Sequence, residues 1–132
     1  LTNAPGNGAA IGGLKVSAPD LAKYMQMHMN HGKLGKVKLI SKASSKKMQT
    51  GLSAKENYGL ALLETDRLIP GEHMIGHTGS AYGLYGNMFF EPKKKFGFVV
   101  ITNGCIPTID RNEDIVMSKE VINLLYQDFI KK

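Results

Sequence analysis

The stretch LYGNMFFEPKKKFGFVVIT, residues 84–102, decides the fold. Its two ends, residues 84–90 and 96–102, are rich in aromatic and β-branched side chains, which favour extended strands. Between them, Glu91-Pro92-Lys93-Lys94-Lys95 has the polar, proline-containing composition of a connection between strands. We therefore expect two neighbouring antiparallel strands, the second of which ends at Asn103-Gly104.

The residues that precede this hairpin continue the same pattern. Residues 58–65 and 74–78 favour strands, and Pro70-Gly71 between them is a turn signal. The pattern predicts three or four antiparallel strands in succession.

Helical signals flank the strands on both sides. Ser17-Ala18-Pro19-Asp20 has the residues of a helix start, apolar residues follow at helical spacing, and Gly32 ends the helix. After a short extended piece at residues 37–40, Ser41 is placed to cap a second, weaker helix toward Met48. A third helix is expected over residues 114–130, and its apolar stripe comprises Ile115, Ile122, Leu125 and Phe129.

The chain is therefore expected to be a single α+β domain over residues 1–132, with an antiparallel β-sheet flanked by helices. A length of 132 residues excludes two independent catalytic domains. The single cysteine, Cys105, cannot form a disulfide within the chain. The sequence contains no run of about 18 apolar residues, the length that would predict a membrane span. The 17 Lys and Arg against 11 Asp and Glu give a net charge of +6, and the lysines are dispersed along the chain, which disfavours a nucleic-acid partner.

The residues most suited to chemistry lie between Gly76 and Gly86. A histidine, hydroxyl groups and several glycines at the end of a strand allow a ligand to approach the backbone closely. A glycine-rich hairpin without function is an equally good interpretation of this composition. His73 and His77 are about 13 Å apart along an extended chain, too far to share a metal, so no metal is expected. Neither Gly83 nor Gly86 is followed by the Lys-Ser or Lys-Thr of a phosphate loop, and no strand precedes Gly6-Asn7-Gly8, so no cofactor is expected. We expect the side chain of His28 to be half-buried and that of His31 to face solvent.

Several motifs occur together in an order that resembles a known family. They are GGLKVSAPDLAKYM at residues 12–25, Tyr58-Gly59-Leu60, Gly76-His77-Thr78-Gly79, Pro92, and Val99-Val100-Ile101-Thr102-Asn103. Together they resemble the C-terminal part of the serine β-lactamase-like and penicillin-binding family. The resemblance is greatest to the branch of class C β-lactamases, D-Ala-D-Ala carboxypeptidases and related esterases, and it implies a partial β-lactamase/transpeptidase-like fold.

The resemblance also implies roles for four residues. His77-Thr78-Gly79 matches the family's third active-site motif, on the strand that borders the cleft. His77 would then donate a hydrogen bond or steer protons near the nucleophile, Thr78 and Gly79 would bind substrate, and the Ser80 backbone N–H would stand in the oxyanion hole.

The family's nucleophile belongs to a Ser-x-x-Lys motif well before this region. Ser44-Ser45-Lys46-Lys47 satisfies that string, but it falls after the helix that it should precede, and we interpret it as a coincidence. Tyr85-Gly86-Asn87 satisfies Tyr-x-Asn in an equally misplaced position. The chain is therefore expected to be the C-terminal part of a larger serine hydrolase, inactive alone. The substrate of the whole enzyme would be a β-lactam, a D-Ala-D-Ala peptide or an ester.

Two other functions remain open: a non-catalytic ligand-binding module on the same fold, and a basic nucleic-acid-binding domain, whose affinity would fall steeply with salt. The family's sheet also includes N-terminal strands beside residues 96–102. We therefore expect this edge to pair with a missing N-terminal segment or with a second copy. The resemblance suggests a periplasmic or extracellular location, which the residues themselves do not address.

Overall fold

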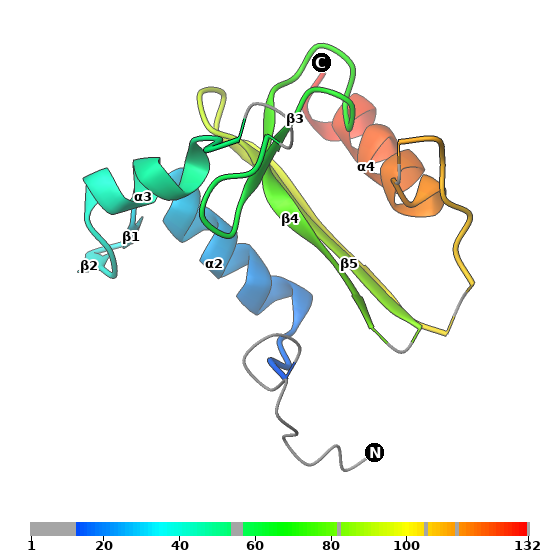
Figure 1. Ribbon diagram of the computed structural model, residues 1–132, viewed down its shortest axis with the longest axis horizontal. Coiled ribbons are helices and arrows are strands. Elements are labelled where there is room, and N and C mark those ends of the chain that lie inside the picture. Colours follow the sequence, from blue (N-terminus) through cyan, green and yellow to red (C-terminus); the bar gives the residue numbers. More distant parts are fainter. Residues whose placement is uncertain (1–12, 54–56, 82, 105, 113, 132) are drawn as a thin grey trace.

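Four antiparallel strands form the central sheet of the computed structural model, which describes residues 13–53, 57–81, 83–104, 106–112 and 114–131. The strands are β3 (Leu63–Thr65), β4 (Met74–Ala81), β5 (Leu84–Glu91) and β6 (Phe96–Thr102), and they lie side by side in that order (Figure 1). Phe89 stands opposite Gly76 on β4 and Phe98 on β6. The hairpin at residues 84–102 is thus confirmed. The expectations for Gly6-Asn7-Gly8, Gly12 and Cys105 concern residues outside the described ranges.

Two strands differ in length from the sequence prediction. The expected strand at residues 58–65 is reduced to β3, because Ala61 has a φ of 64° and the Gly59 N–H donates to the Leu62 carbonyl, so the chain turns before it extends. By contrast, β4 continues past residue 78 as far as Ala81. Gly79 there pairs with Gly86 instead of ending the strand.

Helix α2 (Ala18–Met29) and helix α3 (Lys42–Gln49) begin where the sequence predicts. The Ser17 hydroxyl accepts a hydrogen bond from the Asp20 N–H at 3.3 Å, and the Ser41 hydroxyl accepts one from the Ser44 N–H at 2.9 Å. These bonds satisfy backbone donors that the first turn of a helix leaves free. Between the helices, β1 (Lys33–Leu34) and β2 (Val37–Lys38) form a separate two-stranded hairpin, of which only the second strand was expected.

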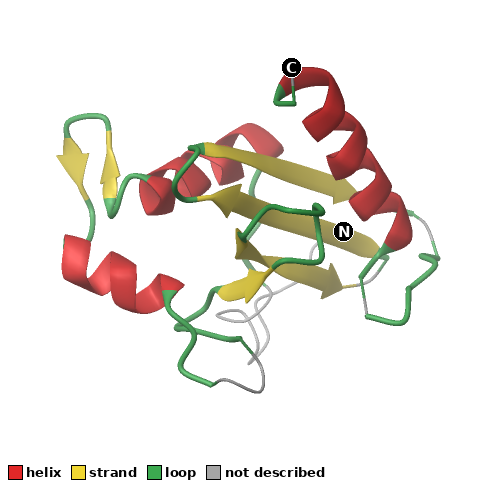
Figure 2. Ribbon diagram, turned by 90° about the horizontal axis from the view of Figure 1, so that it is seen from above, coloured by secondary structure: helices red, strands yellow, loops and turns green. Residues whose placement is uncertain are grey.

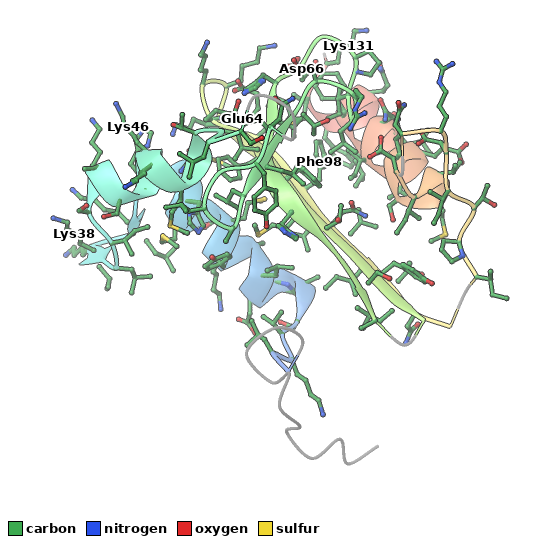
Figure 3. The ribbon with its side chains drawn as sticks, viewed as in Figure 1. Lys38, Lys46, Glu64, Asp66, Phe98 and Lys131 are labelled. Atoms are coloured by element: carbon green, nitrogen blue, oxygen red, sulfur yellow. The ribbon has the colours of Figure 1, made fainter. Side chains whose placement is uncertain are left out.

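Helices cover both faces of the central sheet (Figure 2). On one face, Met25 of α2 packs with Ile75, Met88 and Phe90. On the other face, Ile122 of α4 (Val116–Phe129) packs in a second core. That core also holds Met74, Phe89 and Phe98, and Phe98 projects from the sheet toward α4 (Figure 3). Consecutive residues such as Phe89 and Phe90 enter different cores because side chains alternate along a strand.

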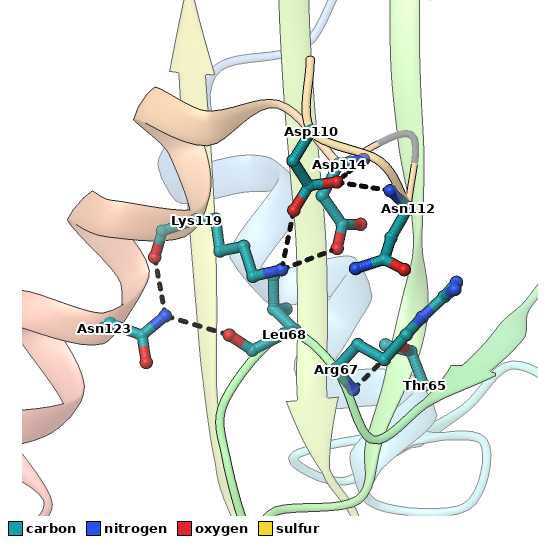
Figure 4. Close-up of polar contacts among 8 residues, drawn as sticks. All are labelled: Thr65, Arg67, Leu68, Asp110, Asn112, Asp114, Lys119 and Asn123. Carbon is teal, nitrogen blue, oxygen red and sulfur yellow. Dashed lines mark hydrogen bonds and ion pairs between the residues drawn. The ribbon is translucent and has the colours of Figure 1, made fainter. Parts of the chain in front are cut away.

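Polar contacts tie α4 to the loop between β3 and β4 and to the loop that precedes α4 (Figure 4). The Asn123 side-chain amide donates to the Leu68 carbonyl at 2.9 Å, and the Lys119 ammonium lies 3.0 Å from a carboxylate oxygen of Asp110 and of Asp114. A further link joins α4 to the turn between β5 and β6. It runs through Glu72 in the loop between β3 and β4: its buried carboxylate accepts hydrogen bonds from Lys94 of that turn, at 2.6 and 2.7 Å, and from the hydroxyl of Tyr126 on α4. The Lys94 ammonium is the main reason that the pKa of Glu72 lies below its usual value.

The structure corrects the expectation for the two histidines that follow Tyr24. His28 is fully buried, with the ring of Tyr24 at 4.7 Å in an edge-to-face contact, and burial lowers its pKa. His31 is partly buried, and its pKa is also lowered, first by burial and then by nearby lysines. Both side chains were expected to be more exposed. Helical spacing within residues 18–29 does not show that α3 packs beside this helix, with the Gln49 side chain donating to the His28 carbonyl. Within the described ranges, no helix is long and apolar enough to cross a bilayer.

Candidate active site

Strand β4 carries all four residues singled out in the sequence, His77, Thr78, Gly79 and Ser80. The pairing of β4 with β3 ends at Gly76, opposite Leu63, whereas the pairing with β5 continues to Ala81. Among the described residues, the segment 77–81 therefore has a strand partner on one side only. All of its residues are exposed, so this edge of β4 is open to a ligand.

The side chains of this segment alternate between the two faces of the sheet. His77 and Gly79 share the face of Ile75, which packs toward α2, whereas Thr78 and Ser80 share the face of Met74, which packs toward α4. A ligand that contacts both His77 and Thr78 must therefore lie along the edge of β4. The resemblance implies that His77 and Thr78 act on the same ligand. Because their side chains lie on opposite faces of the sheet, only a ligand along the strand edge can contact both.

A groove of about 770 Å³ adjoins this segment on the α2 side. Small-molecule sites commonly have volumes of about 300–1,000 Å³. Its walls include six apolar side chains, Leu14, Val16, Leu21, Leu84, Met88 and Ile101. His77, Thr78 and Asn87 also line the groove; the side chain of His77 lies on the α2 face, whereas those of Thr78 and of its strand partner Asn87 lie on the α4 face. The groove thus combines an apolar surface with a few polar groups near the exposed end of β4, as ligand sites usually do.

Two polar residues of this region were missed or dismissed from the sequence. Asn87 is buried on β5 and its side-chain amide nitrogen has no partner among the described residues. Tyr58 lies before β3, and its hydroxyl is 2.7 Å from Nε2 of His77, with the two rings in edge-to-face contact. The string Tyr58-Gly59-Leu60 marked Tyr58 as part of a motif, but local sequence does not show that it reaches His77.

The ring of His77 has polar partners at both nitrogens. Nε2 meets Tyr58, and Nδ1 meets the backbone carbonyl oxygen of Thr78. Because both nitrogens are engaged, the orientation of the imidazole is determined on two sides. A ligand that approaches His77 therefore meets a ring whose position is already set.

Ser44 and Lys47 of the Ser-x-x-Lys string lie on α3, and neither lines the groove. The Ser44 hydroxyl is exposed and shares a hydrogen bond of 2.8 Å with that of Ser41. Charge does not define the groove either: Lys15 is its sole lysine among the described residues, while Lys38 and Lys46 project into solvent from β2 and α3 (Figure 3). Among the described residues, the hydroxyl that meets His77 is therefore that of Tyr58, and the Ser-x-x-Lys string lies elsewhere on α3.

Comparisons with known proteins bear on the family to which the chain belongs. Residues 2–117 match the family model described as Beta-lactamase. Among solved structures, the chain is similar to the octameric penicillin-binding protein homologue from Pyrococcus abyssi, with 30% sequence identity and a TM-score of 0.54. The similarity covers 67% of this chain and 20% of that one, so the chain matches about a fifth of that protein's length. A search of the curated proteins finds no match. The match to the family model extends over most of the sequence, and the chain therefore belongs to the β-lactamase family.

Proposed function

We propose that this chain is the C-terminal part of a serine hydrolase that transfers acyl groups from a β-lactam, a D-Ala-D-Ala peptide or an ester. The branch of class C β-lactamases and related carboxypeptidases and esterases is the one that its motifs resemble most. The observation that carries the proposal is the exposed edge of β4 at residues 77–81, with His77 oriented on two sides and a groove next to it.

Each residue of this wall has a role that its chemistry supports. The Ser80 backbone N–H serves as a donor to the oxyanion that forms when a serine attacks the acyl carbonyl, and one such donor contributes about 3–4 kcal/mol to transition-state stabilisation. Gly79 has no atom within 4 Å of the place where a side chain would begin, so an acyl group can lie against the backbone there. Thr78 donates its hydroxyl to the ligand from the other side of the strand.

The nucleophile comes from polypeptide outside this chain in the proposed enzyme. Acyl transfer requires a hydroxyl within hydrogen-bond reach of a base, and preorganised donors alone do not provide one. The apolar walls of the groove are suited to pack against the segment that brings this hydroxyl. On this proposal, the 132 residues hold one side of a cleft that a second segment completes.

The isolated chain is expected to hydrolyse neither nitrocefin nor a p-nitrophenyl ester above the uncatalysed rate. Ser44→Ala should leave the measured rate unchanged, because Ser44 is exposed on α3 and bonded to Ser41. Steady-state absorbance assays of the two proteins provide the test. Turnover that disappears in Ser44→Ala would show that the nucleophile lies within this chain and would overturn the proposal.

A second candidate is a binding module that holds a ligand and performs no chemistry. It is favoured by the presence of a groove without a nucleophile among the described residues. The reading frame upstream of Leu1 separates the two candidates. If it encodes a Ser-x-x-Lys motif, His77→Ala in that longer protein should lower kcat/KM by about 10²- to 10⁴-fold, the contribution of a positioned acid or base. If it encodes none, the binding module is supported.

The outer edge of β6 provides a surface for self-association or for the completing segment. β6 is the last strand in the order of the sheet, so its outer edge has no strand partner within the described ranges. Unpaired edge groups readily pair with another strand. We expect sedimentation velocity to show the isolated chain shifting from monomer to dimer as concentration rises. A monomer throughout the concentration series would count against pairing through β6.

A further inference from the structure

We propose that Tyr58 is a positioning residue that holds the neutral ring of His77 in the tautomer with its proton on Nδ1. This inference rests on the proposed function for its meaning, since His77 matters to a ligand only if the β4 edge binds one. The structural part of the inference stands on the contacts of Tyr58 and His77 alone.

The partners of the two ring nitrogens determine where the proton lies. Nδ1 of His77 faces the Thr78 carbonyl oxygen, which carries no hydrogen and can only accept. Nδ1 must therefore bear the proton for this bond to form. A neutral imidazole has a single N–H, so Nε2 is left with its lone pair and accepts a hydrogen bond from the Tyr58 hydroxyl at 2.7 Å.

The backbone around Tyr58 keeps its hydroxyl at this place. The Tyr58 carbonyl accepts from the Leu52 N–H at 2.8 Å, and Tyr58 forms isolated bridge pairs with Ser53 and Leu63. The next residue, Gly59, is buried against the backbone of Met48: a Cβ atom at Gly59 would lie 2.4 Å from the Met48 carbonyl oxygen. The backbone of Tyr58 is thus attached both to the segment that follows α3 and to the start of β3, and its side chain reaches His77 from this fixed backbone.

This arrangement changes what His77 can offer to a ligand. The single N–H of the neutral ring is committed to the Thr78 carbonyl, and the lone pair of Nε2 is committed to Tyr58. A ligand that requires Nε2 must displace the Tyr58 hydroxyl or bind through it. Tyr58 therefore controls access to the histidine that the family resemblance places in the cleft wall.

The test is the nitrogen chemical shifts of His77 in the ¹⁵N-labelled chain at about pH 8, where an ordinary imidazole is neutral. Two-bond proton–nitrogen spectra distinguish a protonated ring nitrogen from an unprotonated one, and the signals of His77 are assigned by their loss in His77→Gln. In the unsubstituted chain we expect a protonated Nδ1 and an unprotonated Nε2. A protonated Nε2 would overturn the proposal without any variant being needed.

Tyr58→Phe keeps the ring and removes only the hydroxyl. We expect the Nε2 resonance of His77 to move, because it loses its donor, whereas the other histidines keep their shifts. Tyr24→Phe is the matched control, since Tyr24 makes a similar edge contact with His28, whose nitrogens have no hydrogen-bond partner among the described residues. That control should move neither Nε2 of His77 nor the nitrogens of His28 by a comparable amount. An Nε2 resonance of His77 at the same position in the unsubstituted chain and in Tyr58→Phe would contradict the proposal.

These spectra need no substrate, so they separate the inference from the proposed function. The expected shifts combined with a failure of the chain to bind a β-lactam, a D-Ala-D-Ala peptide or an ester would support the role of Tyr58 and count against the proposed site. Binding at residues 77–81 with an unchanged Nε2 resonance in Tyr58→Phe would support the proposed site and count against the role of Tyr58.

Discussion

Gly76→Ala is expected to destabilise the chain by at least about 3 kcal/mol, at or beyond the upper end of the usual cost of overpacking. A Cβ atom at Gly76 would lie 1.9 Å from the Met88 carbonyl oxygen and 2.7 Å from the Phe89 Cα atom. Both contacts are with backbone, which cannot move aside without separating β4 from β5. Because folded domains of this size are stable by only about 5–15 kcal/mol, the urea midpoint should fall sharply.

Gly79→Ala is the matched control on the same strand. Nothing lies within 4 Å of a Cβ atom built at Gly79, and the residue is exposed. Its free energy of unfolding should stay within about 0.5 kcal/mol of that of the unsubstituted chain. The proposed function adds that this variant folds but binds the acyl ligand less well, because the methyl group occupies the place of the acyl group. Equal losses of stability in Gly76→Ala and Gly79→Ala would show that the close backbone contacts at Gly76 are not the cause of the destabilisation.

Phe90→Ala should lower the free energy of unfolding by about 3–5 kcal/mol. Phe90 has an exposed fraction of 0% and packs with Met25 and Ile75 beneath α2. Removing its ring leaves a cavity that the surrounding strands cannot close, because β5 is paired on both sides. Chemical denaturation followed by far-UV circular dichroism measures the loss.

Two further variants serve as comparisons for Phe90→Ala. Leu84→Ala truncates a 46% exposed side chain on the same strand and should cost about 0.5 kcal/mol or less. Phe89→Ala should be as costly as Phe90→Ala but should disturb amide signals around α4, whereas Phe90→Ala should disturb those around α2. Identical patterns of disturbed signals would mean that the two faces of the sheet are not separate cores.

Local sequence was sufficient for the features whose causes lie within a few residues. The hairpin at residues 84–102, the capping serines Ser17 and Ser41 and the burial of Ile122 were predictable, whereas Phe129, expected on the same stripe, is 68% exposed. A cap or a turn depends on the backbone of its own segment, and alternation along a strand follows from the geometry of one chain. The family resemblance likewise rests on short strings such as His77-Thr78-Gly79.

Contacts between distant segments were not predictable in this way. The sequence indicated a long strand from Tyr58, but the turn at Ala61 shortens it to β3. The burial of His28 depends on how the chain returns along α3, and that of Asn87 depends on both neighbouring strands. Propensities and periodicity describe a residue's neighbours in the chain, and they carry no information about partners that only folding brings near.

The sequence by itself determined that this protein is an α+β domain, and it pointed to His77, Thr78, Gly79 and Ser80. Only the tertiary structure decided that these residues follow the end of the β3 pairing, on an edge that a ligand can reach, and that Tyr58 meets His77 from 19 positions away. The physical reason is that side-chain type and spacing are written along the chain, whereas the exposure of a strand edge and the partners of a ring nitrogen depend on which segments pack together.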